Sequence, residues 1–209
     1  MGNRLARRGT ALLVVVAALL ALSAPPAGAV PVPVSGTFTA TGTFTFACDF
    51  AQESTDGSGD WSGLGPVTFH LDWCVGLPPQ DQEAWPVSSG SFTVTAAAGT
   101  LSGAMGGEVM GNTPGPDGRF PFALVLTVTG GTGDYAAATG TLTLDGLLEY
   151  VPTFSRNLDG TVSGTIEVAV RTPTSKADCR HGNWRNLTDE TGTPFASMAG
   201  CIRWVKRHL

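Results

Sequence analysis

Two titratable side chains lie two residues apart in a short alternating segment, and they form the pair best suited to acid–base chemistry. They are His70 and Asp72, within residues 67–73, where apolar residues take every second position. Residues two apart in a strand share one face of the sheet. Facing inward, an imidazole and a carboxylate could exchange protons with a ligand or orient its polar group. Facing outward, they are ordinary surface residues, and the sequence leaves both orientations open.

A second pair, Asp134 and Tyr135, lies in the glycine-rich segment 130–140. Strand-like runs, Phe120–Thr129 and Thr141–Leu144, flank this segment, so we exclude a phosphate-binding loop, which must precede a helix. The glycines suit a turn with positive φ. Asp134 and Tyr135 could reach a barrel mouth and contact a ligand there, whereas a tyrosine in a loop more commonly packs against its neighbours.

Several other polar and aromatic residues are weaker candidates. Three lie near expected strand ends: Glu108, Glu149 and Tyr150. Three tryptophans could line a pocket or stack on a sugar, with core or rim packing as the alternative: Trp61, Trp73 and Trp85. These residues widen the set of possible ligand contacts without assigning a reaction.

The sequence predicts no cofactor and no metal site. Segment 56–60 has the first three ligand spacings of a calcium loop, but Trp61 and Val67 occupy positions that require glycine and glutamate. No Cys-x-x-Cys pair occurs, and the three histidines lie far apart in the chain. We therefore expect segment 56–60 to be an acidic turn.

Four cysteines follow the leader segment, which predicts two disulfides formed in an oxidising compartment. Pairing between near neighbours gives Cys48–Cys74 and Cys179–Cys201. Each would close a loop of about 20 to 30 residues, worth roughly 3 kcal/mol. One difficulty is that Cys48 alternates with aromatic residues whereas Cys74 alternates with polar ones. Cysteines at strand ends, a bulge, or inward-facing His70 and Asp72 would each resolve it, and strand ends are favoured.

The first 29 residues are typical of a secretory signal peptide. Basic residues precede an uncharged apolar run, Thr10–Leu22, and segment 27–29 offers a cleavage site after Ala29. The run is shorter than the roughly 20 residues of a membrane span, so cleavage and export are favoured over a membrane anchor. The sequence thus predicts a secreted, extracellular protein with no membrane span.

Charge is unevenly divided along the rest of the chain. Residues 30–172 hold 14 acidic and 3 basic side chains, whereas residues 173–209 hold 3 acidic and 6 basic ones. The acidic body would repel phosphates, which argues against a nucleic-acid partner. The basic tail could touch an anionic cell-envelope surface, or it could complement the acidic body within the molecule.

Period-two patterns dominate residues 30–172. From Thr37 to Phe50 the even positions carry mainly aromatic residues and the odd positions mainly threonines, which indicates a strand with one buried face. Similar runs begin near Val67, Phe92, Phe120, Leu142 and Val162. Turn signals separate them, including 56–60, 106–107 and 159–160. Short strands without helices predict an all-β fold over residues 30–172, an antiparallel barrel or sandwich of seven to nine strands. A closed antiparallel β-barrel of about eight strands, which would leave no strand edge exposed, is the fold class we expect.

Residues 173–209 are expected to form a small helical tail clamped by the Cys179–Cys201 disulfide. Thr193 and Pro194 have the residue types of an N-cap and a first helical position. Apolar residues then recur at intervals of three and four: Phe195, Met198, Ile202, Val205 and Leu209. This pattern predicts a short helix with one apolar face, whose basic C-terminal end suits the helix dipole.

The segment Gly130-Gly131-Thr132-Gly133-Asp134-Tyr135, with Ala138 and Gly140, resembles the G-G-T/S-G-x-aromatic-x-x-A-x-G signature of dirigent proteins and allene oxide cyclases. The resemblance covers at most residues 35–171. It implies the eight-stranded barrel of these plant families, which secreted bacterial proteins share. Their catalytic side chains come from elsewhere in the barrel and match no positions here, so we assign none.

The tail is similar to one found in secreted actinobacterial proteins, with the pattern Cys-x-x-Gly-x-Trp-Arg followed by a second cysteine. Segment Cys179–Arg185 and Cys201 carry the match. After Arg185, the residues Asn186–Glu190 and a longer insertion replace the usual Phe and Lys-Asn-Gln-Gly segment. The resemblance gives the tail no assigned activity.

Three functions are compatible with the sequence. The first is non-catalytic binding of a small apolar ligand or a surface partner, with His70, Asp72, Asp134 and Tyr135 as candidate contacts. The second is a cyclase-like or dirigent-like enzyme acting in the barrel cavity. The third is a cell-envelope structural protein that uses its basic tail. The sequence favours the first and leaves the ligand, any reaction and the oligomeric state open.

Overall fold

The computed structural model describes most of the chain after residue 28. The described residues are 29–78, 83–110, 114–115, 117–151, 154–169, 171–180, 184 and 187–209. The signal peptide predicted up to Ala29 therefore lies almost wholly outside the described residues. Gly182 and Arg185 of the tail motif, His181, and Val170 of the last predicted strand also lie outside them.

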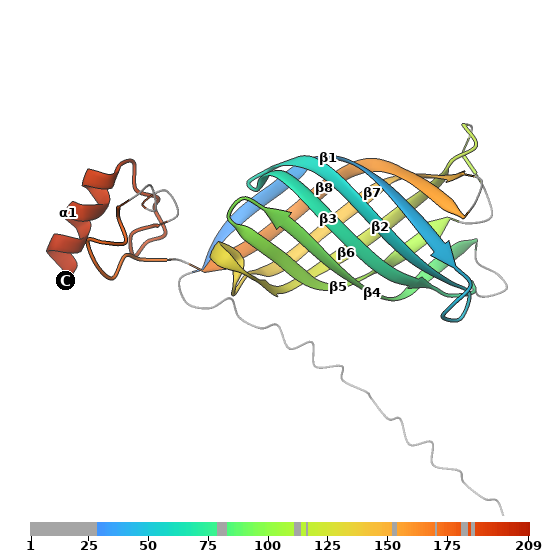
Figure 1. Cartoon of the computed structure of the whole chain (residues 1–209), viewed down its shortest axis with the longest axis horizontal. Helices are drawn as coiled ribbons and strands as arrows, with labels where there is room; N and C mark the ends of the chain where they lie inside the picture. The colour runs from blue at the N-terminus through green and yellow to red at the C-terminus, as the bar shows by residue number, and fades with distance from the viewer. Residues whose placement is uncertain are drawn as a thin grey trace, which may run out of the picture.

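Eight antiparallel strands close into one barrel, which confirms the predicted fold class (Figure 1). Each strand pairs with the next along the chain, and the last pairs with the first. The strands are β1 Ala29–Thr45, β2 Ala51–Ser62, β3 Gly65–Val75, β4 Ala84–Ala96, β5 Gly99–Met110, β6 Phe120–Gly131, β7 Thr139–Val151 and β8 Ser155–Ala169. Closure pairs every strand on both sides and leaves no exposed edge.

Alternation along each strand fills the barrel with apolar side chains. The pattern predicted around Val67 is confirmed, because Val67, Phe69, Leu71 and Trp73 are all buried. The rings of Phe38 and Phe69 meet edge to face, with centroids 5.7 Å apart, so the middle of the barrel is a packed core. The threonines of β1 from Thr37 to Thr43 lie on its exposed face.

The turn predicted at residues 56–60 is wrong, because these residues lie inside β2. A Cβ atom added at Gly57 would lie 2.1 Å from the ring of Phe69. Glycine is therefore required here to make room for an aromatic ring inside the barrel. The predicted turns at 106–107 and 159–160 are likewise wrong, since these residues lie within β5 and β8.

The first strand ends at Thr45, five residues before the predicted Phe50. The connection to β2 therefore carries Phe46, Cys48 and Phe50. Cys48 has a positive φ of 57° and forms the predicted disulfide with Cys74, near the end of β3. The pairing of β3 with β4 also shifts register just after Cys74. Strand alternation thus does not constrain Cys48, which resolves the difficulty as the favoured strand-end hypothesis predicted.

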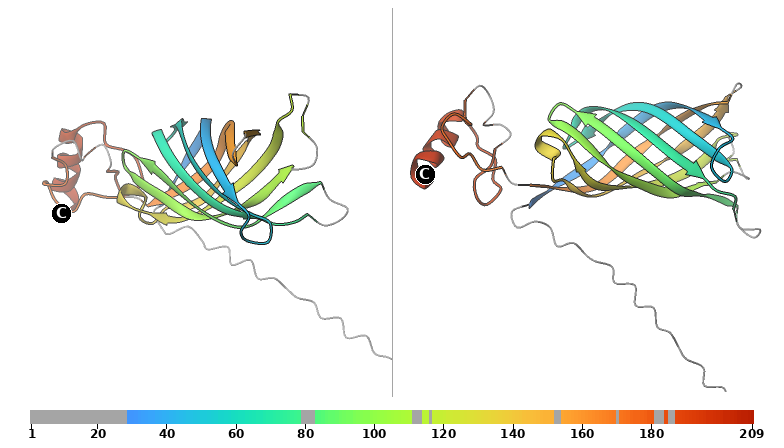
Figure 2. Two further views of the ribbon diagram at one scale, coloured as in Figure 1. Left: turned by 45° about the vertical axis from the view of Figure 1, so that its right-hand side comes forward. Right: turned by 60° about the horizontal axis from the view of Figure 1, so that its bottom comes forward.

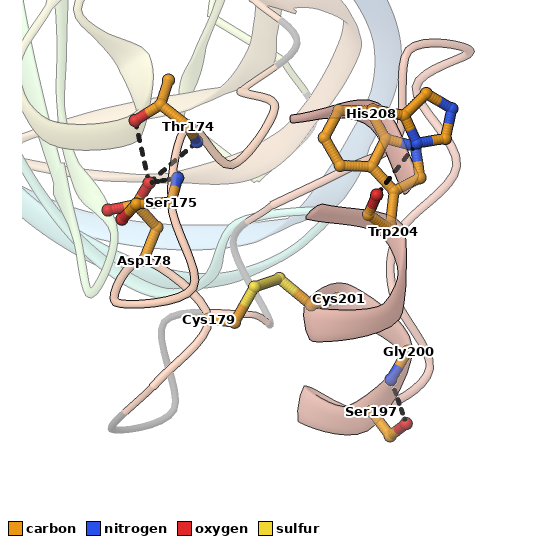
Figure 3. The surroundings of a disulfide bond; sticks show 9 residues. All are labelled: Thr174, Ser175, Asp178, Cys179, Ser197, Gly200, Cys201, Trp204 and His208. Carbon is orange, nitrogen blue, oxygen red and sulfur yellow. Dashed lines mark hydrogen bonds between the residues drawn. A yellow bond between two sulfur atoms is a disulfide. The ribbon is translucent and has the colours of Figure 1, made fainter. Parts of the chain in front are cut away.

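The tail folds around the second predicted disulfide, Cys179–Cys201 (Figure 3). Its helix is α1, Met198–His208, and the Ser197 side chain caps it by accepting from the Gly200 amide at 3.1 Å. Thr193 is therefore not the N-cap that the sequence predicted. Its amide bonds instead to the Asp189 carboxylate, next to a β-bridge between Thr188 and Pro194.

The two ends of the barrel differ, and the tail lies beyond one of them (Figures 1 and 2). At that end, which we call the closed end, the short helix η1 Gly133–Tyr135 connects β6 to β7. The opposite end, which we call the mouth, is where β1 ends and β8 begins. Within the described residues, no helix is long and apolar enough to cross a bilayer.

Candidate functional site

A pocket of about 290 Å³ opens at the mouth of the barrel. Its lining is mostly aromatic and aliphatic and includes two charged side chains: Phe44, Phe46, Phe50, Ala51, Glu53, Trp73, Val75, Trp85, Val109, Leu148, Tyr150 and Arg156. Small-molecule sites share this character, a concave apolar surface with few fixed polar groups. The volume suits a molecule of about two fused rings, at the lower limit of roughly 300 Å³ typical of such sites.

The two charged residues of the pocket form a buried ion pair. The Nε of Arg156 donates to both carboxylate oxygens of Glu53, at 2.9 and 3.0 Å, and its Nη2 lies 2.9 Å from Oε1. Both side chains are about 95% buried. A buried charge is tolerated only when it is paired and hydrogen-bonded, as it is here.

Strand alternation and closure of the barrel bring this pair together. Glu53 on β2 and Arg156 on β8 both take inward positions, and β1 lies between these two strands. Gly42 of β1 pairs with Arg156 on one side and Thr55 on the other. A Cβ at Gly42 would lie 2.4 Å from the Thr55 Oγ1. The missing side chain leaves room for the Thr55 hydroxyl on the inner face of β1, between the strands that carry Glu53 and Arg156.

Two aromatic rings contact the guanidinium of Arg156. The Cζ of Arg156 lies 4.0 Å from the ring centroids of both Phe44 and Tyr150. Cation–π contacts of this kind are strongest where water is excluded. Phe44 in turn packs edge to face against Phe46 and Phe154, with centroids 5.6 and 5.1 Å away. The mouth therefore has an aromatic rim around one fixed cation.

Burial in the apolar pocket shifts the pKa values of two of its residues. Burial raises the pKa of Glu53 above its ordinary value, and the hydrogen bonds and charge of Arg156 oppose that rise. Burial also raises the pKa of Tyr150. Two buried nitrogen donors, Nη1 of Arg156 and Nε1 of Trp73, have no hydrogen-bond partner among the described residues.

The backbone is unusual around the mouth. Among the described residues, two non-glycine residues have a positive φ: Cys48 at 57° and Phe154 at 60°. Both lie in connections at this end, and the Phe154 carbonyl accepts from the Phe44 amide at 3.1 Å. Such conformations cost of order 1–3 kcal/mol and cluster at functional sites. Here they hold the Phe154 ring and the disulfide at the rim.

The structure places His70 and Asp72 on the outer face of β3, which settles the orientation that the sequence left open. His70 bridges two carboxylates, with Nδ1 2.8 Å from Asp56 and Nε2 2.9 Å from Asp72. These hydrogen bonds, first to Asp56 and then to Asp72, raise the pKa of His70. The pair lies outside the pocket, so any role of it in ligand binding stays a prediction separate from this site.

Asp134 and Tyr135 lie in η1 at the closed end and not at the mouth. Tyr135 is buried in the core, and Asp134 forms an ion pair with Arg171 at the start of the tail. The Asp134 amide donates to the Ala98 carbonyl at 2.9 Å, which seals this end against the β4–β5 turn. The structure thus brings neither residue together with the mouth pocket.

The weaker candidates divide between core, surface and pocket. Trp61 is fully buried in the core. Glu108 and Glu149 are exposed, as are Asp56, Ser58 and Asp60. Tyr150, Trp73 and Trp85 line the pocket. Pocket lining was one of the two roles that the sequence left open for the tryptophans.

Sequence reasoning missed Glu53 and Arg156, although a signal for each was present. Glu53 is eight residues before the buried Trp61, and Arg156 is six before the buried Val162. Even spacings along one strand place residues on the same face. Turns were predicted at residues 56–60 and 159–160, which lie inside β2 and β8. These predicted turns separated Glu53 from Trp61 and Arg156 from Val162, so the even spacing within each strand was not recognised. Arg156 is also one of three basic residues between 30 and 172.

Comparisons of the chain with protein-family models, with curated proteins and with solved structures gave no match. The geometry of the mouth is therefore the basis for a functional assignment, and the resemblance to dirigent proteins and allene oxide cyclases stays a prediction.

Proposed function

We propose that this protein binds a small, largely apolar molecule in the mouth pocket. One observation carries the proposal: an apolar pocket of about 290 Å³ that encloses a single buried ion pair. Packing fills the rest of the barrel, so the pocket is not a consequence of a wide barrel. The ligand body would replace water against Phe50, Trp85 and Val109.

Secretion is part of this proposal. Two disulfides join all four cysteines, and such bonds persist in oxidising compartments outside the cytosol. The predicted leader, with basic residues before an apolar run and a cleavage site after Ala29, also supports export from the cytosol. A binding protein with a mouth open to the medium would take up its ligand outside the cell.

Filling the pocket tests the proposal. Val109 lines the pocket and is 6% exposed, whereas Val125 is on the barrel exterior and 40% exposed. Val109→Phe should weaken binding of the neutral fluorophore N-phenyl-1-naphthylamine by at least about tenfold, and the matched control Val125→Phe should leave it unchanged. Equal affinities of both folded variants and the wild type would refute the pocket as the binding site.

Native mass spectrometry of protein secreted from its own host then identifies the natural ligand. We expect a bound small molecule that is lost from Val109→Phe and retained by Val125→Phe. The same mass measurement reports whether the leader ends at Ala29.

Glu53 favours a second candidate, an enzyme of the cyclase or dirigent type that converts its ligand in the pocket. Burial raises the pKa of the Glu53 carboxyl group, and a carboxyl group positioned in a pocket can act as a general acid or base toward a bound ligand. Glu53→Gln retains the shape of the side chain and removes this chemistry. Loss of turnover with retained binding of the co-purified ligand would support an enzyme, and a ligand whose NMR spectrum is unchanged after incubation with either protein would leave binding alone.

A further inference from the structure

The guanidinium of Arg156 is only partly used by the protein. Glu53 occupies Nε and Nη2, whereas Nη1 is buried and has no hydrogen-bond partner among the residues that the structure describes. Nearly all buried polar groups in proteins have a partner, and leaving one unsatisfied costs about 1–3 kcal/mol. An orphaned donor inside a ligand-sized pocket therefore indicates a group that the ligand supplies.

A second donor of the same kind lies nearby. Trp73 also lines the pocket, pairs in register with Glu53 on β2, and has a buried Nε1 without a partner in the described part of the chain. Arginine and tryptophan side-chain nitrogens are donors only. The complementary ligand group must then be an acceptor, such as a carbonyl, ether or carboxylate oxygen.

Charge decides between a neutral and an anionic acceptor. Arg156 is already neutralised by Glu53, so an added carboxylate would have no counter-charge inside the pocket. In the described part of the chain, strand ends and connections at the mouth carry five further carboxylates: Asp49, Glu83, Glu108, Asp117 and Glu149. The remaining cation there, Arg119, is paired with Asp159. This field repels anions, and burying an uncompensated charge is costly.

We propose that the ligand carries a neutral carbonyl oxygen, of the ketone, aldehyde or ester class, that accepts a hydrogen bond from Nη1 of Arg156. This inference rests on the proposed function of the mouth pocket. Tyr150 lies over the guanidinium and is 46% exposed at the rim. Its ring must turn aside for the carbonyl to reach Nη1, and the apolar body of the ligand then takes its place against the guanidinium.

Three naphthalene probes of matched shape test this assignment by isothermal titration calorimetry on the folded, disulfide-bonded protein. They are 2-acetylnaphthalene, which has the ketone; 2-isopropenylnaphthalene, in which a methylene group replaces the oxygen; and 2-naphthoate, which is anionic. We expect the ketone to bind about tenfold more tightly than the alkene, as a hydrogen bond to a charged donor predicts. The naphthoate should bind more weakly than the ketone.

Variants then assign the donor. The double change Glu53→Met and Arg156→Met avoids leaving one charge unpaired, and in it the ketone and the alkene should bind equally. Tyr150→Phe keeps the ring and removes the tyrosine hydroxyl that lines the pocket, and the ketone should still bind about tenfold more tightly than the alkene. A preference that survives the double change would overturn the role of Arg156.

The outcomes distinguish the carbonyl inference from the proposed function of the pocket. Equal binding of ketone and alkene to the wild type would refute the carbonyl inference and leave the pocket as an apolar binding site. Tightest binding of 2-naphthoate would replace the neutral class by an anionic one. Failure of all three probes to bind would refute the proposed function together with the inference.

Discussion

The closed end and the mouth of this barrel are built by the same eight strands, and they differ in what the inward positions carry. At the closed end Trp61 and Ile166 are fully buried, and η1 covers the opening with a backbone hydrogen bond from Asp134 to the β4–β5 turn. At the mouth the inward positions carry Glu53 and Arg156 under a rim of half-exposed rings. Both positive-φ residues other than glycine in the described chain are also at this end.

This difference shows that strand alternation specifies a barrel without specifying a site. An inward position filled by an apolar side chain adds to the core, as Ile166 does. An inward position filled by a charged residue needs a partner from another strand, which fixes one geometry and keeps space open next to it. The five predictions below test whether stability depends mainly on the closed end and ligand binding mainly on the mouth, from the largest expected effect to the smallest.

Breaking the buried pair should have the largest effect. Arg156→Met leaves Glu53 buried without a counter-charge and should lower the free energy of unfolding by about 3–5 kcal/mol. The double change Glu53→Met and Arg156→Met should recover most of this loss. Urea unfolding of the wild type, the single variant and the double variant measures these free energies. Equal losses in the single and double variants would contradict the prediction.

The Arg156→Met variant should also be pH-dependent. Without Arg156, burial raises the pKa of Glu53 further above its unfolded value. A raised folded pKa gives stability that is complete below the unfolded pKa and is lost as pH rises through the folded pKa. The variant should therefore approach wild-type stability in acid and fall below it toward neutral pH.

Truncating an apolar side chain should affect the closed end far more than the rim. Ile166→Ala removes a fully buried side chain and should cost about 2–5 kcal/mol. Phe46→Ala removes a side chain that is 71% exposed and should cost under about 1 kcal/mol. Affinity for N-phenyl-1-naphthylamine should show the opposite order, because Phe46 lines the pocket. Parallel losses of stability and affinity in both variants would remove the distinction between the ends.

The two disulfides should act on separate parts of the molecule. Replacing Cys48 and Cys74 by serine should lower the stability of the barrel by about 3 kcal/mol and weaken ligand binding, because the Phe46–Phe50 segment loses its tether to β3. Replacing Cys179 and Cys201 by serine should expose the tail to protease and leave the barrel melting temperature unchanged. Calorimetry with limited proteolysis compares the two, and a fall in barrel stability in the tail variant would show that the tail supports the closed end.

The smallest effect concerns His70 on the exterior. Hydrogen bonds to Asp56 and Asp72 raise its pKa above the ordinary 6.5, so its stabilising contribution is present at low pH and lost as pH rises through the folded pKa. His70→Asn should cost under about 1 kcal/mol below pH 6.5, since the pair is exposed, and nothing in alkali. Ligand affinity should be unaffected, and a loss of affinity would restore His70 as a binding residue.

The sequence predicted more of the fold than of the site. Period-two runs such as Val67–Trp73 gave the correct buried faces, and the spacing of the cysteines gave both disulfides. Predicted turns failed at Gly57 and Gly160, because glycine also serves inside small barrels where a neighbouring ring or strand leaves no room for a Cβ. A propensity scale cannot distinguish this use from a turn, since the neighbour that requires it is distant in the chain.

The sequence by itself determined that this chain is an all-β barrel with two disulfides, because alternation and cysteine spacing are local properties. Which charged residues share a pocket was decided only by the tertiary structure. Glu53 and Arg156 are 103 residues apart, and they meet because β8 closes onto β1 and both side chains take inward positions. Closure also sends Asp134 and Tyr135 to the end opposite the pocket and turns His70 to the outside. Such contacts depend together on the strand order, on the register and on whether each side chain points inward. No single segment of the sequence determines all three.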